Sequence, residues 1–239
     1  MLENLDAVLL VDKPAGIAFS SVVKTVKRKF NLVKVGHGGS LDASASGLLV
    51  LLVNDANKFV GDVMGADRTY EGTLRIGLAT DTGDIQGRKV DAPKASSQIP
   101  DSARIEAALS EFRGDVFQTE PRFCSVRKEG SAEYSVADTV EHSQFLAHVY
   151  RLQAGQPGVA NADGTVSVPF TLSATKGLIV RALAKDLGES LGCGACLESL
   201  RRTGVGRFKV GEAVPFDRLL ETDVRDFASL TIPLSRAFV

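Results

Sequence analysis

The sequence has no long apolar run, few cysteines and no excess of either charge. No stretch approaches the roughly 20 consecutive apolar residues of a transmembrane helix, and the N-terminus lacks the basic region and apolar stretch of a secretory signal. Three Cys is a small and odd number, which suggests no disulfide framework and fits a reducing compartment. We therefore expect a cytoplasmic protein with no membrane partner.

The charges are nearly balanced, with 28 Lys and Arg against 29 Asp and Glu. A net charge of -1 argues mildly against a nucleic-acid partner, but the test is weak because a basic face can be balanced by acidic residues elsewhere. The 239 residues are 44% hydrophobic, enough for one large domain or two small ones with a real core. The sequence contains no internal repeat and no low-complexity segment.

The most informative stretch is a glycine-rich loop, GHGGSLDASASG at residues 36–47. It presents a single carboxylate, Asp42, just before the apolar run Leu48 to Val53, which reads as a strand buried on both faces. Glycine permits backbone conformations and close approaches that a Cβ forbids. Catalytic groups are often found on loops beside rigid strands, although a polar turn with an exposed Asp is an equally good reading of this segment alone.

The remaining pattern alternates between strands and helices. Strands are predicted for the apolar run 7–11, for the alternating segment 68–76, for 166–172 and for several short pieces of 116–153. Helices are predicted after a plausible N-cap at Ser20-Ser21, over 54–64, after Pro100-Asp101-Ser102, over 178–191, and over about 195–202. Loops rich in turn residues lie at 80–87 and 156–164.

The first of these helices carries a basic face, formed by Lys24, Lys27, Arg28 and Lys29, with Lys34 soon after. Such a face is most often simply solvated. Here it leads directly into the Asp42 loop, where a phosphate backbone would need to lie if the substrate were a nucleic acid. Both readings stay open on the sequence alone.

GHGGSLDASASGLL resembles the catalytic motif of the TruB family of tRNA pseudouridine synthases, whose invariant feature is the Asp. Gly38, Ala43 and Ser44 depart from the commoner Thr, Pro and large apolar residue. Further segments resemble family motifs in the same order: LLVDKPAG at 9–16, RTYEG at 68–72, TDTGDIQG at 80–87, Gln118-Thr119 with Pro121, Arg181 ahead of LAKDLGESLGCGA, and LRRTGVGRF at 200–208.

The resemblance covers about residues 8–210 and implies an α+β fold with a mixed, mostly antiparallel central sheet flanked by helices. We expect residues 1–239 to form a single catalytic domain with a short C-terminal tail. Most members of the family carry a C-terminal RNA-binding domain of the PUA type, and the sequence is expected to lack one. The implied reaction converts the T-loop uridine of tRNA, position 55 in tRNA numbering, to pseudouridine without a cofactor. The implied partner is the T-arm stem-loop, and no obligate protein partner is evident.

The resemblance also assigns catalytic residues. Asp42 is the nucleophile or assists departure of the base. Arg181, if it reaches Asp42 in the fold, would favour the ionised carboxylate and hold its orientation. Tyr70 would stack on the extruded base and is a candidate for removing the ring proton. From the residues alone, Arg181 is more often a surface helix residue and a lone Tyr on a strand more often part of a core.

Four further residues are expected to bind the RNA or support the site. His37 resembles the family His that takes part in holding the T-loop open, though it could merely hydrogen-bond its own loop. Lys13 would support the Asp42 loop or contact a phosphate. Ile179, where the family usually has a Tyr, would line the uracil pocket with Leu200.

Cys193 and Cys196 form a C-x-x-C pair that invites a zinc or redox reading. A structural zinc site needs four ligands, and the other candidates, Cys124, His37, His142 and His148, are scattered in the sequence. We therefore expect no metal. Two other functions stay open: a catalytically weak or inactive paralogue that binds or folds tRNA, and a pseudouridine synthase acting on another structured RNA.

Overall fold

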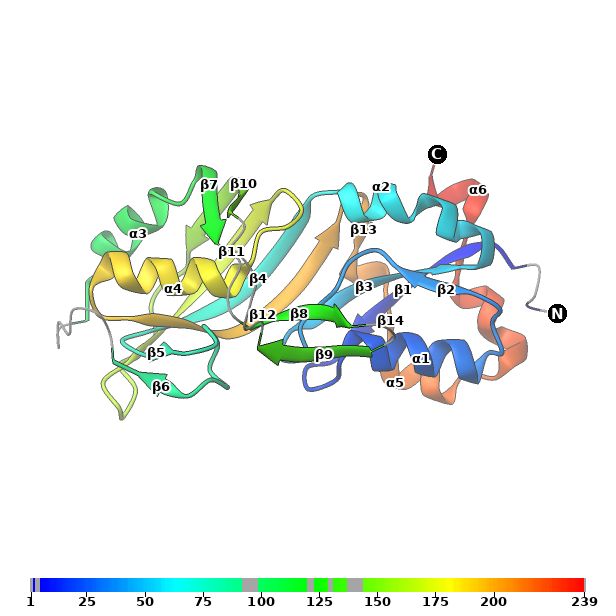
Figure 1. Cartoon of the computed structure of the whole chain (residues 1–239), viewed down its shortest axis with the longest axis horizontal. Coiled ribbons are helices and arrows are strands. Elements are labelled where there is room, and N and C mark those ends of the chain that lie inside the picture. The colour runs from blue at the N-terminus through cyan, green and yellow to red at the C-terminus, as the bar shows by residue number, and fades with distance from the viewer. Residues whose placement is uncertain are drawn as a thin grey trace. The chain divides into compact units, whose positions relative to one another are not determined.

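The computed structural model describes Leu2, residues 5–91, 99–119 and 144–238, and the backbone of 123–128 and 131–136. The chain divides into two compact units, one made of residues 1–69 and 201–239 and the other of residues 70–200 (Figure 1). The fold class is α+β, with a mixed sheet whose strands are mostly antiparallel and are flanked by helices. Strands β4 (Arg68–Ile76) and β12 (Ala195–Val205) each contribute residues to both units.

The first unit is built on a sheet centred on β1 and β3. Its strands are β1 (Ala7–Lys13), β2 (Val35–His37), β3 (Ser46–Val53), β13 (Phe208–Lys209), β14 (Val214–Pro215) and β15 (Ile232–Pro233). Its helices are α1 (Phe19–Lys29), α2 (Val60–Gly65), α5 (Phe216–Glu221), α6 (Leu234–Ala237) and the 3-10 segments η2 (Asn54–Phe59), η3 (Val210–Glu212) and η4 (Val224–Leu230). β3 pairs antiparallel with β1 and β2, and parallel with β12 at Arg201 and Arg202.

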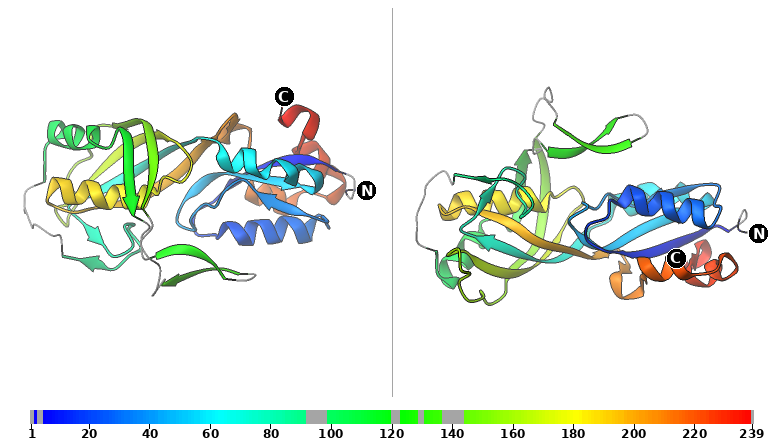
Figure 2. Two further views of the ribbon diagram at one scale, coloured as in Figure 1. Left: turned by 45° about the horizontal axis from the view of Figure 1, so that its top comes forward. Right: turned by 90° about the horizontal axis from the view of Figure 1, so that it is seen from below.

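Alternate residues of β1 and β3 enter two separate cores, because successive side chains of a strand point to opposite faces. Leu9, Val11 and Leu49 pack with Val22 and Val26 of α1, with Phe30 just after it, and with residues of α5 and η4. Figure 2 shows α1 as the blue helix alongside these strands. Val8, Leu10 and Leu48 pack on the other face with residues of η2, α2 and α6. This sheet is therefore covered on both faces, which explains the unbroken apolar sequence of β3.

The second unit packs two helices on one face of a sheet with the strand order β12-β4-β11-β10-β7. Its other strands are β5 (Ala79–Thr80), β6 (Lys89–Val90), β7 (Gly114–Thr119), β8 (Phe123–Lys128), β9 (Ser131–Val136), β10 (Gln144–Ala154) and β11 (Val166–Ala174). The helices are α3 (Ser102–Ser110) and α4 (Val180–Leu191), and both contribute buried side chains to the core of this unit.

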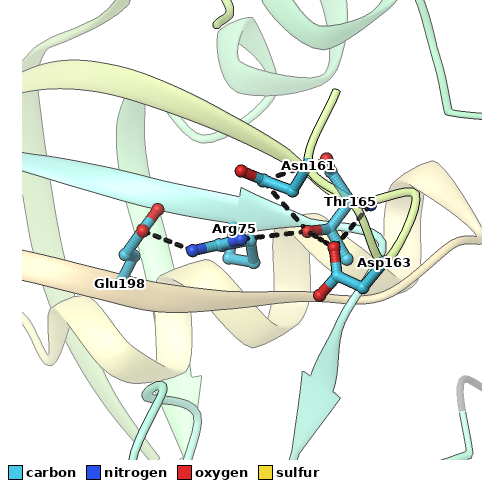
Figure 3. A network of polar contacts seen from close by, with 5 residues as sticks. All are labelled: Arg75, Asn161, Asp163, Thr165 and Glu198. Carbon is cyan, nitrogen blue, oxygen red and sulfur yellow. Dashed lines mark hydrogen bonds and ion pairs between the residues drawn. The ribbon is translucent and has the colours of Figure 1, made fainter. Parts of the chain in front are cut away.

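A polar network joins β4, β12 and the loop before β11 (Figure 3). Arg75 Nη2 lies 2.5 Å from Glu198 Oε1, and Arg75 Nη1 donates to Thr165 Oγ1 at 3.1 Å. Thr165 Oγ1 in turn donates to Asp163 Oδ1 at 2.6 Å, and Asn161 Nδ2 donates to Thr165 Oγ1. The network pins the 155–165 loop to the sheet.

Most predicted elements are confirmed, but two predictions are wrong. Residues 195–202, predicted as a helix, belong to β12. The helix predicted to begin at Ser20-Ser21 begins at Phe19, with Ala18 as an N-cap that has no side-chain hydrogen bond. By contrast, Asp101 caps α3 as predicted, since its side chain accepts from Arg104 N at 2.9 Å. Among the residues that the structure describes, no helix is both long and apolar enough to cross a bilayer.

Candidate active site

The Asp42 loop connects β2 to β3 and presents a half-buried carboxylate. Leu41 and Ala45, on either side of Asp42, are buried and anchor the loop. The backbone turns sharply at this point, with Ala45 N donating to Asp42 O at 3.1 Å. The carboxylate is therefore held on a short turn whose flanks belong to the core.

Two buried arginines hold the glycine-rich part of the loop by its carbonyl groups. Arg202, 2% exposed, donates to Ser40 O at 2.7 Å and to Gly39 O at 3.4 Å, and also to Leu48 O at 2.8 Å. Arg68, 6% exposed, donates to Gly38 O at 2.9 Å and to carbonyls at the end of α2. A buried guanidinium needs such acceptors, because leaving its donors without partners is costly.

Lys13 ties the turn after β1 to the Asp42 loop. Its ammonium is fully buried and donates to Pro14 O and Ile17 O at 2.8 Å each and to Ala43 O at 3.4 Å. Gly16 N donates to the same Ala43 carbonyl at 2.7 Å. In this structure the Lys13 ammonium is directed to carbonyls of the turn after β1 and of the Asp42 loop.

Lys13 interacts electrostatically with both Asp42 and Arg202. Burial lowers the pKa of Lys13 to about 8; the nearby Asp42 carboxylate acts in the opposite direction, and the Arg202 guanidinium lowers the pKa further. The Lys13 ammonium therefore lies within electrostatic range of the Asp42 carboxylate.

His37 contacts its own loop. Gly39 N lies 3.3 Å from His37 Nδ1, which accepts this hydrogen bond, so the ring proton is on Nε2 in this arrangement. The ring also packs against Phe19, the first residue of α1, with 4.8 Å between centroids. His37 thus connects the start of α1 to the glycine-rich loop.

The departure of Gly38 from the common family form has a local steric reason. A Cβ built on Gly38 would lie 2.1 Å from Val63 Cγ1, a separation that real Cβ atoms do not show. Val63 belongs to α2 and is buried. A side chain at position 38 therefore requires a smaller residue, or a displaced helix, at position 63.

Arg181 lies in the second unit and is well anchored there. It is the second residue of α4, is 7% exposed, and donates from Nη1 to Thr82 O at 3.0 Å. Arg181 lies in the first turn of α4, the end of a helix that is unfavourable for a cation. The Thr82 carbonyl, in the 80–87 loop, brings a partial negative charge to its guanidinium.

Ile179 is fixed by a side chain from another strand. It is the N-cap of α4 and half-buried; its N donates to Gln118 Oε1 at 2.8 Å, while Gln118 Nε2 donates to Ile179 O at 3.1 Å. Gln118, on β7, is 1% exposed. Tyr70 on β4 and Leu200 on β12 are both half-buried and pack against the core of the second unit.

The seven predicted site residues thus fall into two groups. The structure brings Lys13, His37 and Asp42 together in the first unit. The other four, Tyr70, Ile179, Arg181 and Leu200, belong to the second unit. Arg68, Arg202 and Gln118 were missed as supporting residues. Each lies in a segment that resembles a family motif, but the resemblance assigns no role to the residue itself.

The C-x-x-C thiols are buried on the second unit. Cys193 and Cys196 are both free, and burial raises the pKa of the Cys196 thiol to about 11. Burial likewise raises the pKa of Cys193. A raised pKa disfavours the thiolate, which is the form of a cysteine that acts as a nucleophile. The side chains of Cys124 and His142 lie outside the described residues.

Known proteins share this fold and sequence pattern. The solved structure titled "Crystal Structure of a Cbf5-Nop10-Gar1 Complex" matches with a TM-score of 0.70 and 22% identity, over 97% of this chain and 61% of that one. The structure of an "H/ACA RNP bound to a substrate RNA containing 2'-deoxyuridine" matches with a TM-score of 0.67, also at 22% identity, over 97% of this chain and 60% of that one. The fold is that of the pseudouridine synthases.

The sequence relatives identify the family within the pseudouridine synthases. Residues 27–169 match the model of the TruB family pseudouridylate synthase N-terminal domain, and residues 181–230 match that of the tRNA pseudouridylate synthase B C-terminal domain. The tRNA pseudouridine synthase B of Burkholderia pseudomallei is 39% identical over 90% of this chain and 69% of its own length. The tRNA pseudouridine synthase B of Opitutus terrae is 34% identical over 98% of this chain and 95% of its own length. The chain belongs to the TruB family of pseudouridylate synthases.

Proposed function

We propose that this protein isomerises the T-loop uridine of tRNA, position 55 in tRNA numbering, to pseudouridine in the cytoplasm, with Asp42 as the nucleophile and without a cofactor. The observation that supports it most is the half-buried Asp42 on a loop whose carbonyls are held by Lys13, Arg68 and Arg202. A carboxylate that must act repeatedly on a large substrate needs such a fixed position.

The reaction breaks the bond between C1′ of the ribose and N1 of uracil, turns the base, and forms a bond from C1′ to C5. The proton on C5 is lost and N1 gains one, so the product is an isomer. Asp42 can act by attacking the uracil ring or by assisting departure of the base, and both routes begin from the ionised carboxylate. The base must first leave its stack, which costs a few kcal/mol.

The remaining residues take the roles that the family resemblance assigns. Tyr70 stacks on the extruded base and is the candidate for removing the C5 proton. Arg181 is the third catalytic residue, and its pairing with Asp42 stays a prediction. Ile179 and Leu200 line the uracil pocket, and His37 takes part in holding the T-loop open. We propose that residues 1–239 act as a single catalytic domain on the T-arm stem-loop.

The test is release of tritium from C5-labelled uridine in an unmodified tRNA transcript. Wild type should release tritium, Asp42→Asn should not, and both should bind the transcript. Asp62→Asn, which alters an exposed carboxylate on α2, is the matched control and should behave as wild type. Release by Asp42→Asn would refute the mechanism.

The position of the modified uridine in tRNA requires a separate experiment. A T-arm hairpin should be modified and an anticodon-arm hairpin should not, and changing the uridine at tRNA position 55 to cytidine should abolish release from the full transcript. Binding of tRNA by wild type without any release would instead identify a binding paralogue. Release from a transcript lacking that uridine would indicate another target.

A further inference from the structure

The segment between Asp12 and Asp42 holds no Asp or Glu, while it holds five Lys and one Arg. Those six cations leave the rest of the chain with a net charge of -7. A polyanion is therefore repelled by most of the chain and attracted by this segment. Because the segment ends at Asp42, the positive charge is concentrated next to the proposed catalytic loop.

Three of these cations share one exposed face of α1. Lys24, Lys27 and Arg28 are spaced three and four residues apart, the spacing of neighbours on a helix surface, and all three are exposed. We call these three residues the α1 basic face; Figure 1 labels the helix itself. Lys34, just beyond the helix, is also exposed, whereas Lys29 is half-buried and donates to Leu220 O at 2.7 Å.

No ion pair of the α1 basic face is found among the residues that the structure describes. The ion pairs there involve other cations, such as Lys58 with Asp55 and Arg225 with Asp223. Like charges at these spacings repel one another. No ion pair within the described residues offsets the mutual repulsion on α1, and an external polyanion would relieve it.

The α1 basic face is rigidly connected to the Asp42 loop within the first unit. Phe19, the first residue of α1, packs on His37, and Lys13 joins Ile17 O, two residues before the helix, to Ala43 O. Val22, Val26 and Phe30 fix the opposite face of α1 in the core at 0–1% exposure. These contacts give the basic face a defined place beside the loop.

The buried face of α1 also distinguishes between two possible polyanions, a membrane surface and a nucleic acid. A helix that binds a membrane surface inserts its apolar side among the lipids, and the apolar side of α1 is already used by the core. A phosphate backbone requires only the exposed cations. We propose that the α1 basic face binds the phosphate backbone of the tRNA substrate, as a contact surface outside the catalytic loop.

This inference rests on the proposed function, and its test distinguishes a failure of the inference from a failure of the proposed function. The variant Lys24→Gln/Lys27→Gln/Arg28→Gln removes three charges and keeps good helix formers. The control Lys58→Gln/Arg225→Gln/Arg236→Gln removes three exposed charges from other segments of the same unit. Equal thermal melting curves would establish that all three proteins are folded.

Binding of an unmodified tRNA transcript is measured across a salt series. The α1 variant should bind about tenfold more weakly at physiological salt, and its plot of log K against log salt should be shallower by about two. KM for tRNA should rise much more than kcat falls. The control variant should stay within about twofold of wild type, since its cations lie off the proposed path.

Each other result overturns the inference. If wild type releases tritium but the α1 and control variants bind tRNA equally, the surface is wrong while the proposed function stands. If wild type binds no tRNA, both fail. If the α1 variant keeps its affinity for tRNA but loses binding to vesicles that contain phosphatidylglycerol, the α1 basic face is a lipid contact instead.

Discussion

Gln118 and Ile179 are joined by two hydrogen bonds, in which a single buried amide side chain satisfies both the N–H and the C=O of one residue. Ile179 thereby takes an extended backbone just before α4, with φ of -96° and ψ of 101°. Arg181 follows two residues after Ile179. The start of α4 is therefore positioned by a side chain from β7, 61 residues earlier in the chain.

Replacing Gln118 with Leu should lower the free energy of unfolding by about 2–3 kcal/mol, because two buried backbone groups lose their partners. The proposed uracil pocket includes Ile179, so kcat/KM for tRNA should fall by about tenfold as well. Urea unfolding and tritium release measure the two effects. Gln153→Leu, at an exposed amide on β10, is the control and should change neither. An unchanged kcat/KM in Gln118→Leu would show that Ile179 does not depend on this contact.

Arg202 should be more important for the Asp42 loop than its place outside the predicted site suggests. Arg202→Met leaves three carbonyls without their donor and should destabilise the fold by about 3 kcal/mol. Arg202→Lys keeps the charge, but one ammonium does not reproduce the spread of a guanidinium. This variant should therefore keep much of the stability while losing tritium release by at least about tenfold.

The control for Arg202 is Arg218→Met, at an exposed arginine on α5. It should match wild type in urea unfolding and in turnover. Full activity of Arg202→Lys would mean that the loop keeps its geometry without the three separate hydrogen bonds.

The missed role of Arg202 and the wrong helix at 195–202 have one physical cause. Ala195, Leu197, Glu198 and Leu200 favour a helix locally, and tertiary pairing overrides that preference. In β12, successive side chains point to opposite faces. Arg201 therefore pairs with Asp12, at 2.6 and 2.9 Å, while Arg202 points to the loop.

The sequence was more reliable where its signals are local. The buried strand β3 could be predicted from its apolar run, and the start of α3 from Asp101, because each signal lies within a few residues of the element. The hydrogen bonds of Arg68 to Gly38, of Arg202 to Gly39 and of Gln118 to Ile179 join residues 30 to 163 positions apart, so no local pattern contains them.

Gly38 and Val63 should be energetically coupled. Gly38→Thr, which restores the common family residue, places a Cβ against Val63 and should cost about 1–3 kcal/mol of stability through overpacking. Val63→Ala removes the contacting methyl, so the double variant should be more stable than the sum of the single effects predicts, by about 1 kcal/mol. A double-mutant cycle by urea unfolding measures the coupling, and additive effects would show that the loop moves away from α2 without strain.

Lys13 should impart a characteristic pH dependence to folding. Its pKa is about 8 in the folded protein and 10.5 in the reference state, so between these values the unfolded chain binds more protons than the folded one. The free energy of unfolding therefore gains a contribution from Lys13 as pH rises from about 8 to 10.5, and none as pH falls below 8. Lys13→Met lacks this group, so the stability of wild type relative to this variant should increase across that window. Urea unfolding of both proteins from pH 7 to 10.5 measures the difference. A difference that is flat, or that falls with pH, would mean that the ammonium keeps its proton in the folded state and remains a permanent positive charge beside Asp42.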